Sequence, residues 1–239
     1  MRSKSIIVLL ILLALTPGIA IGSGTPDKPL VFFAEDQRSD AHPHRLRGIE
    51  IQAARFTDAV STMLVEDFAG KRSGRTSPLE ISLTDGQREV TAILDGAGLI
   101  RSRAFAGAHA VSSERFWGSS DRFDVHFSEP VSSLGFVVTD LGDKGGDLNL
   151  ELTLVDGQVL DLPVPHSRYL PDDPRAAGLD SQVIFYGVTG LPAPVVSVSF
   201  VSLEPGRDFF ALDRLMVEPL PRMQIGPPGS VLAQPEGGQ

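Results

Sequence analysis

The 239-residue sequence contains no cysteine, one tryptophan (Trp117) and two tyrosines. The absence of cysteine excludes disulfide bonds, a thiol nucleophile, a lipoprotein anchor and any metal site with thiolate ligands. The chain also lacks the G-x-S-x-G elbow, the P-loop, a G-x-G-x-x-G after a strand and H-E-x-x-H, which mark common classes of enzyme. The fold must therefore be stabilised by its hydrophobic core, and no motif predicts an enzyme.

Basic residues are outnumbered, with 21 Lys and Arg against 30 Asp and Glu, which gives a formal net charge of −9. Residues 1–22 hold two of the basic residues and no acidic one, so without them the charge is 19 − 30 = −11. An acidic surface repels phosphate, and this argues against nucleic acid as a partner. The excess carboxylates are available to divalent cations.

The N-terminus has the parts of a secretory signal peptide. Arg2 and Lys4 form a basic start, residues 6–15 are an apolar run, and small residues follow. The run is shorter than the roughly 20 apolar residues that a membrane-spanning helix needs. We therefore expect cleavage after Ala20 or Gly22 and a secreted protein, extracellular or periplasmic, whose mature form has no membrane span.

Alternating apolar residues predict β-strands along most of the remaining chain. The stretch from Phe123 to Leu154 indicates three strands interrupted by an acidic, glycine-containing loop. Asp85-Gly86 and Asp156-Gly157 each join two alternating runs, which predicts hairpins whose two central residues have positive φ. Further strands are predicted at residues 79–83, 90–94, 159–164, 183–188, 195–203 and 211–217, and an edge strand at 30–34.

One helix is predicted before these strands. Apolar residues recur every three or four positions from Leu46 to Met63, which indicates an amphipathic helix that packs on the strands or binds a partner. Short strands with a single helix predict an all-β fold, a jelly roll or β-sandwich, as one domain over residues 45–219. Residues 1–22, 23–44 and 220–239 are predicted as signal peptide, polar lead-in and disordered Pro/Gly-rich tail.

Several sequence phrases occur together between about Ile51 and Val217. They include VEDF, FSEPVSSLGF, TDLGDKGG, FYGV and FFALDRLMV. In this order they resemble exported bacterial β-sandwich proteins that often carry a C-terminal PEP-CTERM sorting tail. Pro-Glu-Gly occurs at residues 235–237 without the apolar span and arginine cluster of such a tail, so an anchoring role is not expected. The resemblance implies secretion and a cell-surface or extracellular-matrix setting.

The chain is more loosely similar to calcium-bearing, galactose-binding-like jelly-roll carbohydrate-binding modules. In these modules an acidic residue on the first core strand and an Asp just before the last strand bind one structural calcium. Asp213 in LDRL matches the second position, and Glu66 or Asp67 is the carboxylate nearest the first. The resemblance implies a structural Ca²⁺ at these residues. The alternative is a charged residue at a strand end that pairs with an arginine.

A second candidate calcium site is the loop that contains Asp140, Asp143 and Asp147. Carboxylate oxygens are ligands that Ca²⁺ prefers, and two glycines make the loop adaptable, although the spacing is not that of an EF-hand. A solvated turn is one alternative, because Asp and Gly favour turns. A contact to a glycan or a partner is the other.

Trp117 and Tyr169 are the candidate ligand-binding aromatics, because an exposed ring can pack on the CH-rich face of a sugar. The alternative for Trp117 is a core position under a loop. His126 alternates outward on its strand, which predicts a surface histidine or a sugar contact. His42 and His44 have no third metal ligand near them in the sequence.

These features predict a secreted, non-catalytic β-sandwich of the cell envelope or extracellular matrix, which binds polysaccharide or a cell surface and is stabilised by calcium. One alternative is a structural matrix protein without glycan specificity. The other is a polysaccharide-active hydrolase, which would need two carboxyl groups at a set separation in a cleft.

Overall fold

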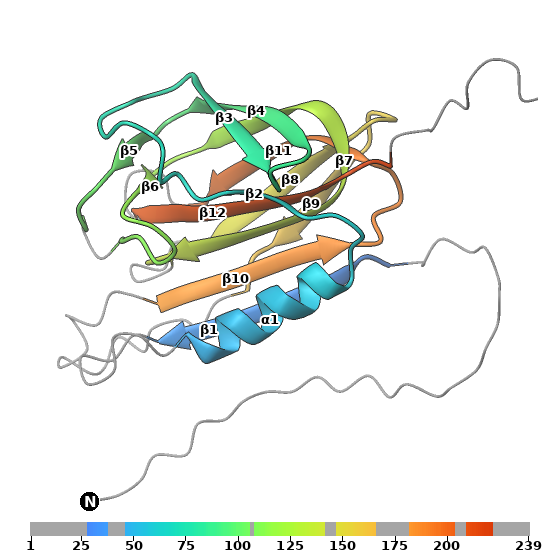
Figure 1. The fold of residues 1–239 in the computed structure, drawn as a ribbon, viewed down its shortest axis with the longest axis horizontal. Helices are drawn as coiled ribbons and strands as arrows, with labels where there is room; N and C mark the ends of the chain where they lie inside the picture. Colours follow the sequence, from blue (N-terminus) through green and yellow to red (C-terminus); the bar gives the residue numbers. More distant parts are fainter. Residues whose placement is uncertain are drawn as a thin grey trace, which may run out of the picture.

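A computed structural model describes residues 28–37, 46–105, 108–141, 147–165, 182–203 and 209–221. These residues form one helix and twelve strands (Figure 1), which confirms the predicted all-β sandwich, while a jelly-roll connectivity stays a prediction. The predictions for the signal peptide, for His42 and His44, for Asp143 and Tyr169, and for the tail from residue 222 lie outside the described residues.

The elements in chain order are β1 (Leu30–Gln37), α1 (Arg47–Asp58), β2 (Leu64–Glu66), β3 (Leu79–Thr84), β4 (Glu89–Gly96), β5 (Leu99–Arg101), β6 (Phe116–Ser119), β7 (Phe123–Thr139), β8 (Leu148–Leu154), β9 (Val159–Pro163), β10 (Gln182–Thr189), β11 (Val195–Ser202) and β12 (Phe210–Pro219).

The strands form two layers that share β7. The open layer has the order β3-β4-β7-β11-β8-β9. The helix-covered layer contains β1, β10, β7, β12, β6 and β5. The first part of β7 pairs with β4 and β11, and its last part pairs with β10 and β12. Because β2 pairs with both β12 and β3, it connects the layers a second time.

The continuity of β7 corrects one sequence prediction. Three strands were expected between Phe123 and Leu154, but the first two are a single 17-residue strand, followed by β8. The strand changes partners near its middle, where Pro130 has no partner in any of the paired registers. Proline lacks the N–H that a ladder requires, so it fits in a strand at such a point.

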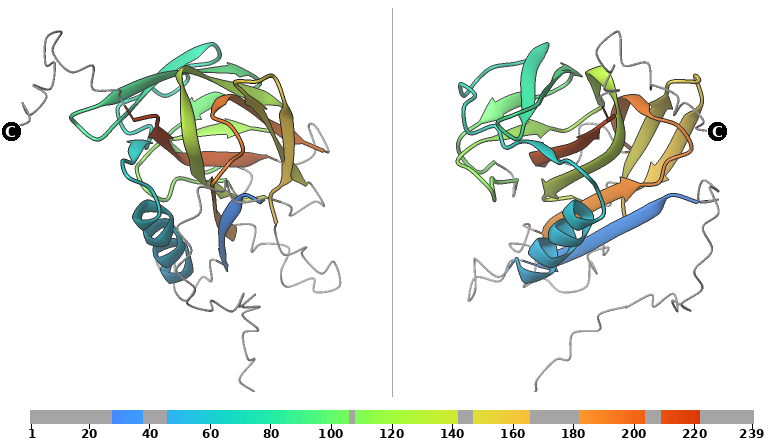
Figure 2. Two further views of the ribbon diagram at one scale, coloured as in Figure 1. Left: turned by 90° about the vertical axis from the view of Figure 1, so that its right-hand side faces the viewer. Right: turned by 45° about the vertical axis from the view of Figure 1, so that its right-hand side comes forward.

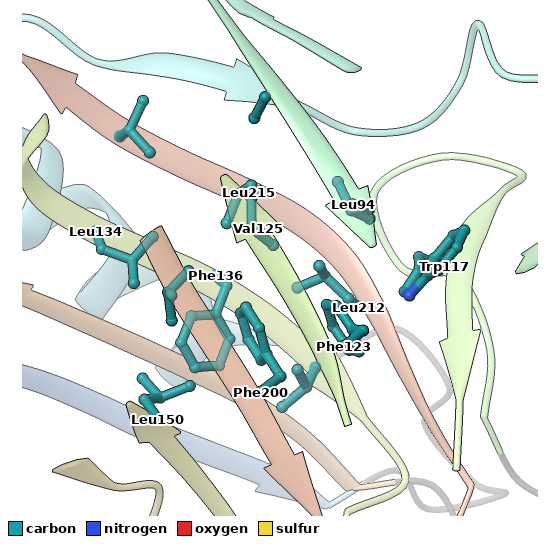
Figure 3. Packing of buried hydrophobic residues seen from close by; sticks show 14 of the residues in the cluster. Leu94, Trp117, Phe123, Val125, Leu134, Phe136, Leu150, Phe200, Leu212 and Leu215 are labelled. Atoms are coloured by element: carbon teal, nitrogen blue, oxygen red, sulfur yellow. The ribbon is translucent and has the colours of Figure 1, made fainter. Parts of the chain in front are cut away.

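The core between the layers is rich in aromatic side chains (Figure 3). The rings of Phe123 and Phe200 stack with centroids 4.7 Å apart, and Phe136 meets Phe200 edge-on at 5.1 Å. Trp117 lies against Phe123 at 6.1 Å, and all four side chains are fully buried. Each such pair contributes about 0.5–1.5 kcal/mol beyond its buried area.

Helix α1 lies beside β1 and β10 (Figure 2), and its bounds are narrower than the predicted Leu46–Met63. The ring of Phe56 sits over Gly135 of β7 and Gly187 of β10, which are direct cross-strand partners. A Cβ at these two glycines would lie 2.6 and 2.9 Å from ring atoms, so only glycine leaves room for the ring. The helix therefore packs on the strands, as one of the two interpretations predicted. No helix in the described residues is long and apolar enough to cross a membrane.

Both predicted Asp-Gly hairpins are present, but their loops are longer than the two-residue turn. Only the glycines have positive φ, +87° at Gly86 and +83° at Gly157. The side chain of Asp85 instead accepts hydrogen bonds from the N–H groups of Gln87 (2.8 Å) and Arg88 (2.7 Å). At Gly157 the loop is typical of a type I turn followed by a left-handed residue, and the N–H of Gly157 donates to the carbonyl of Leu154 at 3.0 Å.

Candidate ligand-binding face

The solvent side of the open layer carries two rows of side chains that cross its strands. Successive residues of a strand point to opposite faces, so the positions between the buried residues of β4, β7, β11, β8 and β9 share one face. The registers place these positions side by side. The acidic row consists of Asp95, Asp124, Ser199, Glu151 and Asp161, and the mixed row of Ile93, His126, Ser197, Thr153 and Val159.

Arg122 crosses the acidic row. Its Nη1 lies 3.0 Å from Glu151 Oε2 and its Nε lies 3.4 Å from Asp124 Oδ1. Its Nη2 donates a hydrogen bond of 2.8 Å to Ser199 Oγ. One guanidinium among four carboxylates leaves the row with an excess of negative charge. Because these side chains are between one-third and one-half exposed, their remaining acceptor sites face water.

A pocket of about 270 Å³ lies at one end of this face. It is lined by Asp147, Leu148, Asn149, Pro163, Val164, Pro165 and Leu203. Asn149 is on the same side of β8 as Glu151, so the pocket continues the polar face. Leu203 is 59% exposed, and together with the prolines it gives the pocket an apolar wall.

Trp117 lies in the core on β6 and is fully buried (Figure 3), so it does not contribute to this face. Its ring packs against Gly98, where a Cβ would come within 2.3 Å of it. Gly98 has a φ of +148°, a conformation that favours glycine. The sequence analysis gave a core position as the alternative for Trp117, and the structure shows Trp117 in the core. Tyr169 is outside the described residues.

Asp213 is fully buried in a β-bulge of β12. Its Oδ1 accepts a hydrogen bond from the N–H of Val111 (2.8 Å), and its Oδ2 accepts from the N–H (2.9 Å) and the hydroxyl (2.5 Å) of Ser112. Burial raises the pKa of Asp213, and the hydrogen bonds from Ser112 and Val111 oppose this shift only in part. The carboxylate thus holds the segment before β6 against β12.

Glu66 and Asp67 have hydrogen-bond donors close to them in the chain. Glu66 Oε1 accepts from the N–H of Phe68 (2.6 Å), and its Oε2 lies 3.2 Å from Lys71 Nζ. Asp67 Oδ1 accepts from the N–H of Ala69 at 3.0 Å. Through the N–H groups of Phe68 and Ala69 these carboxylates anchor the local backbone, as Asp213 does for the segment before β6.

In the second candidate calcium site, Asp140 is buried with a φ of +63°, and its N–H donates to the carbonyl of Gln182 at 2.9 Å. Asp147 lines the pocket described above. Among the described residues, no three Asp, Glu or His side chains form a group that could hold a metal ion. Calcium at either place stays a prediction.

Sequence reasoning did not identify the acidic row. Its members come from five strands, and only the strand registers place them together. The available signal was the set of polar residues between the apolar ones of each strand. His126 was predicted to point outward, and it is exposed.

No protein-family model and no curated protein match the chain. Among solved structures, it is similar to the K1 cleaved adhesin domain of Lys-gingipain from Porphyromonas gingivalis W83, with 13% identity, a TM-score of 0.38, and coverage of 67% of this chain and 100% of that one. It is also similar to TmCBM61 in complex with β-1,4-galactotriose, with 14% identity, a TM-score of 0.28, and coverage of 63% and 97%. The family 11 carbohydrate-binding module of a cellulosomal cellulase of Clostridium thermocellum has 10% identity, a TM-score of 0.19, and coverage of 62% and 99%. At these scores the similarity does not extend to a site or a ligand.

Proposed function

We propose that this protein is a secreted, non-catalytic binding module of the cell envelope or extracellular matrix, and that it binds a polysaccharide on the exposed face of its open layer. The observation that carries the proposal is the pair of rows, in which carboxylate, hydroxyl and imidazole groups from five strands share one solvent-facing surface.

The chemistry of the rows suits a ligand with many hydroxyl groups. Carboxylates accept O–H hydrogen bonds that are about twice as strong as those between neutral groups. Neighbouring strands are about 4.8 Å apart, so a row across five strands repeats its polar groups over roughly 19 Å. A polysaccharide also repeats its hydroxyl groups, and it can therefore make the same contact on several strands.

The charge of the acidic row restricts the class of polysaccharide. Four carboxylates and one guanidinium repel a chain of uronate or sulfate groups at this face. The ligand of the open layer is therefore a neutral or amino-sugar polysaccharide. The pocket beside Asn149 would accept a chain end, with its apolar wall against the CH face of a sugar ring.

The test is isothermal titration of the mature protein with neutral glucans and galactans and with chitosan oligosaccharides. His126→Ala/Asp161→Ala removes two exposed side chains that make no hydrogen bond or ion pair in the described structure. Loss of one charge-assisted hydrogen bond costs about 1.5 kcal/mol, so we expect affinity to fall about tenfold or more. Glu50→Ala/Asp58→Ala on the exposed side of α1 is the matched control and should leave affinity unchanged.

Three outcomes would overturn the proposal. Undiminished affinity of His126→Ala/Asp161→Ala would exclude this face as the site. A folded wild-type protein that stays associated with cells or matrix but binds none of the polysaccharides would favour a structural role. Polysaccharide cleavage that is lost in a variant of the acidic row would establish a hydrolase.

A further inference from the structure

A basic surface lies at the β5 end of the strand order, at the opposite end from β9. Two segments, 72–76 and 99–105, run side by side there. The N–H of Gly74 donates to the carbonyl of Ile100, and the N–H of Ile100 donates to the carbonyl of Arg75, each at 2.8 Å. Neither segment contains Asp or Glu. We define the basic edge as Arg72, Arg75, Arg101, Arg103 and the adjoining Phe105.

The arginines of the basic edge have no carboxylate partner among the residues that the structure describes. Arg72, Arg75 and Arg103 are exposed, and in the described part of the chain they form no ion pair. By contrast, Arg88 and Arg122 on the open layer pair with carboxylates at 2.8 to 3.4 Å. A concentration of uncompensated positive charge on a chain of net charge −9 attracts an anionic ligand to this edge.

Arg101 is held in place by aromatic rings. The centre of its guanidinium lies 4.1 Å from the centroid of the Phe105 ring and 4.9 Å from that of Phe209. The two rings meet edge-to-face at 5.0 Å, and Phe105 is 48% exposed. Nε of Arg101 is buried, so an anion would be bound by its two Nη groups, whose N–H directions lie in the plane that stacking does not use. Because the stack already orders the guanidinium, less entropy is lost when it binds an anion.

We propose that the basic edge is a second ligand site, which binds an acidic polysaccharide. Carboxylate or sulfate groups pair with the guanidinium forks of the arginines, because planar forks match these anions with two parallel hydrogen bonds. Phe105 packs against a sugar ring of the same chain. This site has the opposite charge to the open layer and does not depend on the function proposed for that face.

A polysaccharide fits the basic edge better than a nucleic acid does. Binding of nucleic acid rests on neutralising a dense line of phosphates, and the acidic remainder of this surface repels such a line. Single-stranded nucleic acid also requires several aromatic rings for successive bases. In the described residues, the basic edge exposes one large aromatic ring, that of Phe105.

The test measures binding of the mature protein to polygalacturonate and heparin, with neutral dextran and single-stranded DNA as comparison polymers. Arg72→Ala/Arg75→Ala/Arg103→Ala removes three exposed charges from the basic edge. The matched control, Lys28→Ala/Arg47→Ala/Arg55→Ala, removes three exposed charges elsewhere. We expect wild-type binding to at least one acidic polysaccharide, a loss of affinity of tenfold or more in the first variant, and a change below twofold in the control.

Arg101→Lys keeps the charge but removes the planar group that stacks on Phe105, and it should weaken binding several-fold. Equal losses in the two triple variants would show bulk charge attraction and overturn the proposal. Tighter binding of DNA than of either acidic polysaccharide, or no binding of either at low salt, would also overturn it. The variant His126→Ala/Asp161→Ala should retain the acidic polysaccharide, so failure at one site leaves the result at the other intact.

Discussion

Replacement of Asp213 by alanine should destabilise the protein to the same extent with and without calcium. The substitution leaves the N–H groups of Val111 and Ser112 and the hydroxyl of Ser112 without their acceptor. A donor left unsatisfied costs about 1–3 kcal/mol, and the lower end applies here because Val111 and Ser112 are only partly buried. Three donors give about 3 kcal/mol, and the removal of a buried carboxylate offsets part of it.

We therefore expect a loss of roughly 2–3 kcal/mol. For a chain of this size, this lowers the melting temperature by roughly 4–12 °C. The assay is thermal unfolding in EDTA and in a calcium series, with the exposed Asp161→Ala as a control that should change little. A ligand that binds only the folded state raises its apparent stability. A calcium-dependent rise in the wild type that is absent from Asp213→Ala would refute the hydrogen-bonding role and establish a metal ligand.

The pH dependence gives a second signature of the same residue. Burial places the pKa of Asp213 in the folded protein above the unfolded value of 3.8. Over the window between these two values, the folded protein holds a proton that the unfolded chain has lost, so stability falls as pH rises through the window. Asp213→Asn does not titrate, and urea unfolding of this variant should lack that fall. An unchanged pH profile in Asp213→Asn would refute the assignment.

Two further predictions concern the helix-covered layer. The pKa of Glu218 is raised by burial, but hydrogen bonds from Ser61, Ser133 and Ser132 outweigh this and place it below 4.5. The ionised carboxylate therefore contributes stability above pH 4.5, and this contribution is lost as pH falls through the pKa of the folded state. Urea titrations of Glu218→Gln should show a smaller loss of unfolding free energy on acidification than the wild type. An unchanged loss would contradict this. Gly187→Ala places a Cβ 2.9 Å from the Phe56 ring and should cost about 1–3 kcal/mol in chemical unfolding. Phe56→Leu removes the ring that the new Cβ would meet, so the double variant Gly187→Ala/Phe56→Leu should lose less stability than the sum of the two single variants. Strict additivity would show that the ring and the Cβ do not meet.

Strands that bury one face, such as β3 and β8, were predictable from alternation, whereas β10 and the last part of β7 are buried on both faces and were predictable from their apolar runs. β8 alternates buried and half-buried residues along its whole length, and its period-2 pattern is visible in the sequence. β6 was missed because it has only four residues, all buried, so it offers neither an alternation nor an apolar run as long as that of β10. For the same reason the sequence could not decide whether Trp117, within β6, is exposed or belongs to the core. β2 and β5 have three residues each, which is too short for a periodic pattern.

The two proposed sites were not predictable from local patterns, because each combines residues from separate segments of the chain. The sequence shows that Asp124, Glu151 and Asp161 point away from the core, but only the registers through β11 and β8 bring them into one row. The basic edge was missed because its arginines are divided between two separate segments. Hydrogen bonds at Ile100 place those segments side by side, and no local pattern encodes such a contact.

The open layer and the basic edge also depend on the fold in different ways. The rows of the open layer are spaced by backbone ladders, whose geometry does not change with the outward side chains. A substitution such as Asp161→Ala can therefore alter ligand binding without altering the core. The basic edge depends on side-chain packing, because the stack of Arg101 on Phe105 and Phe209 fixes one guanidinium plane. Binding at the open layer rests mainly on hydrogen bonds, whereas binding at the basic edge rests on exposed charges that salt screens within about 8 Å at physiological ionic strength. Increasing salt should therefore weaken binding at the basic edge first, and this separates the two sites without any mutation.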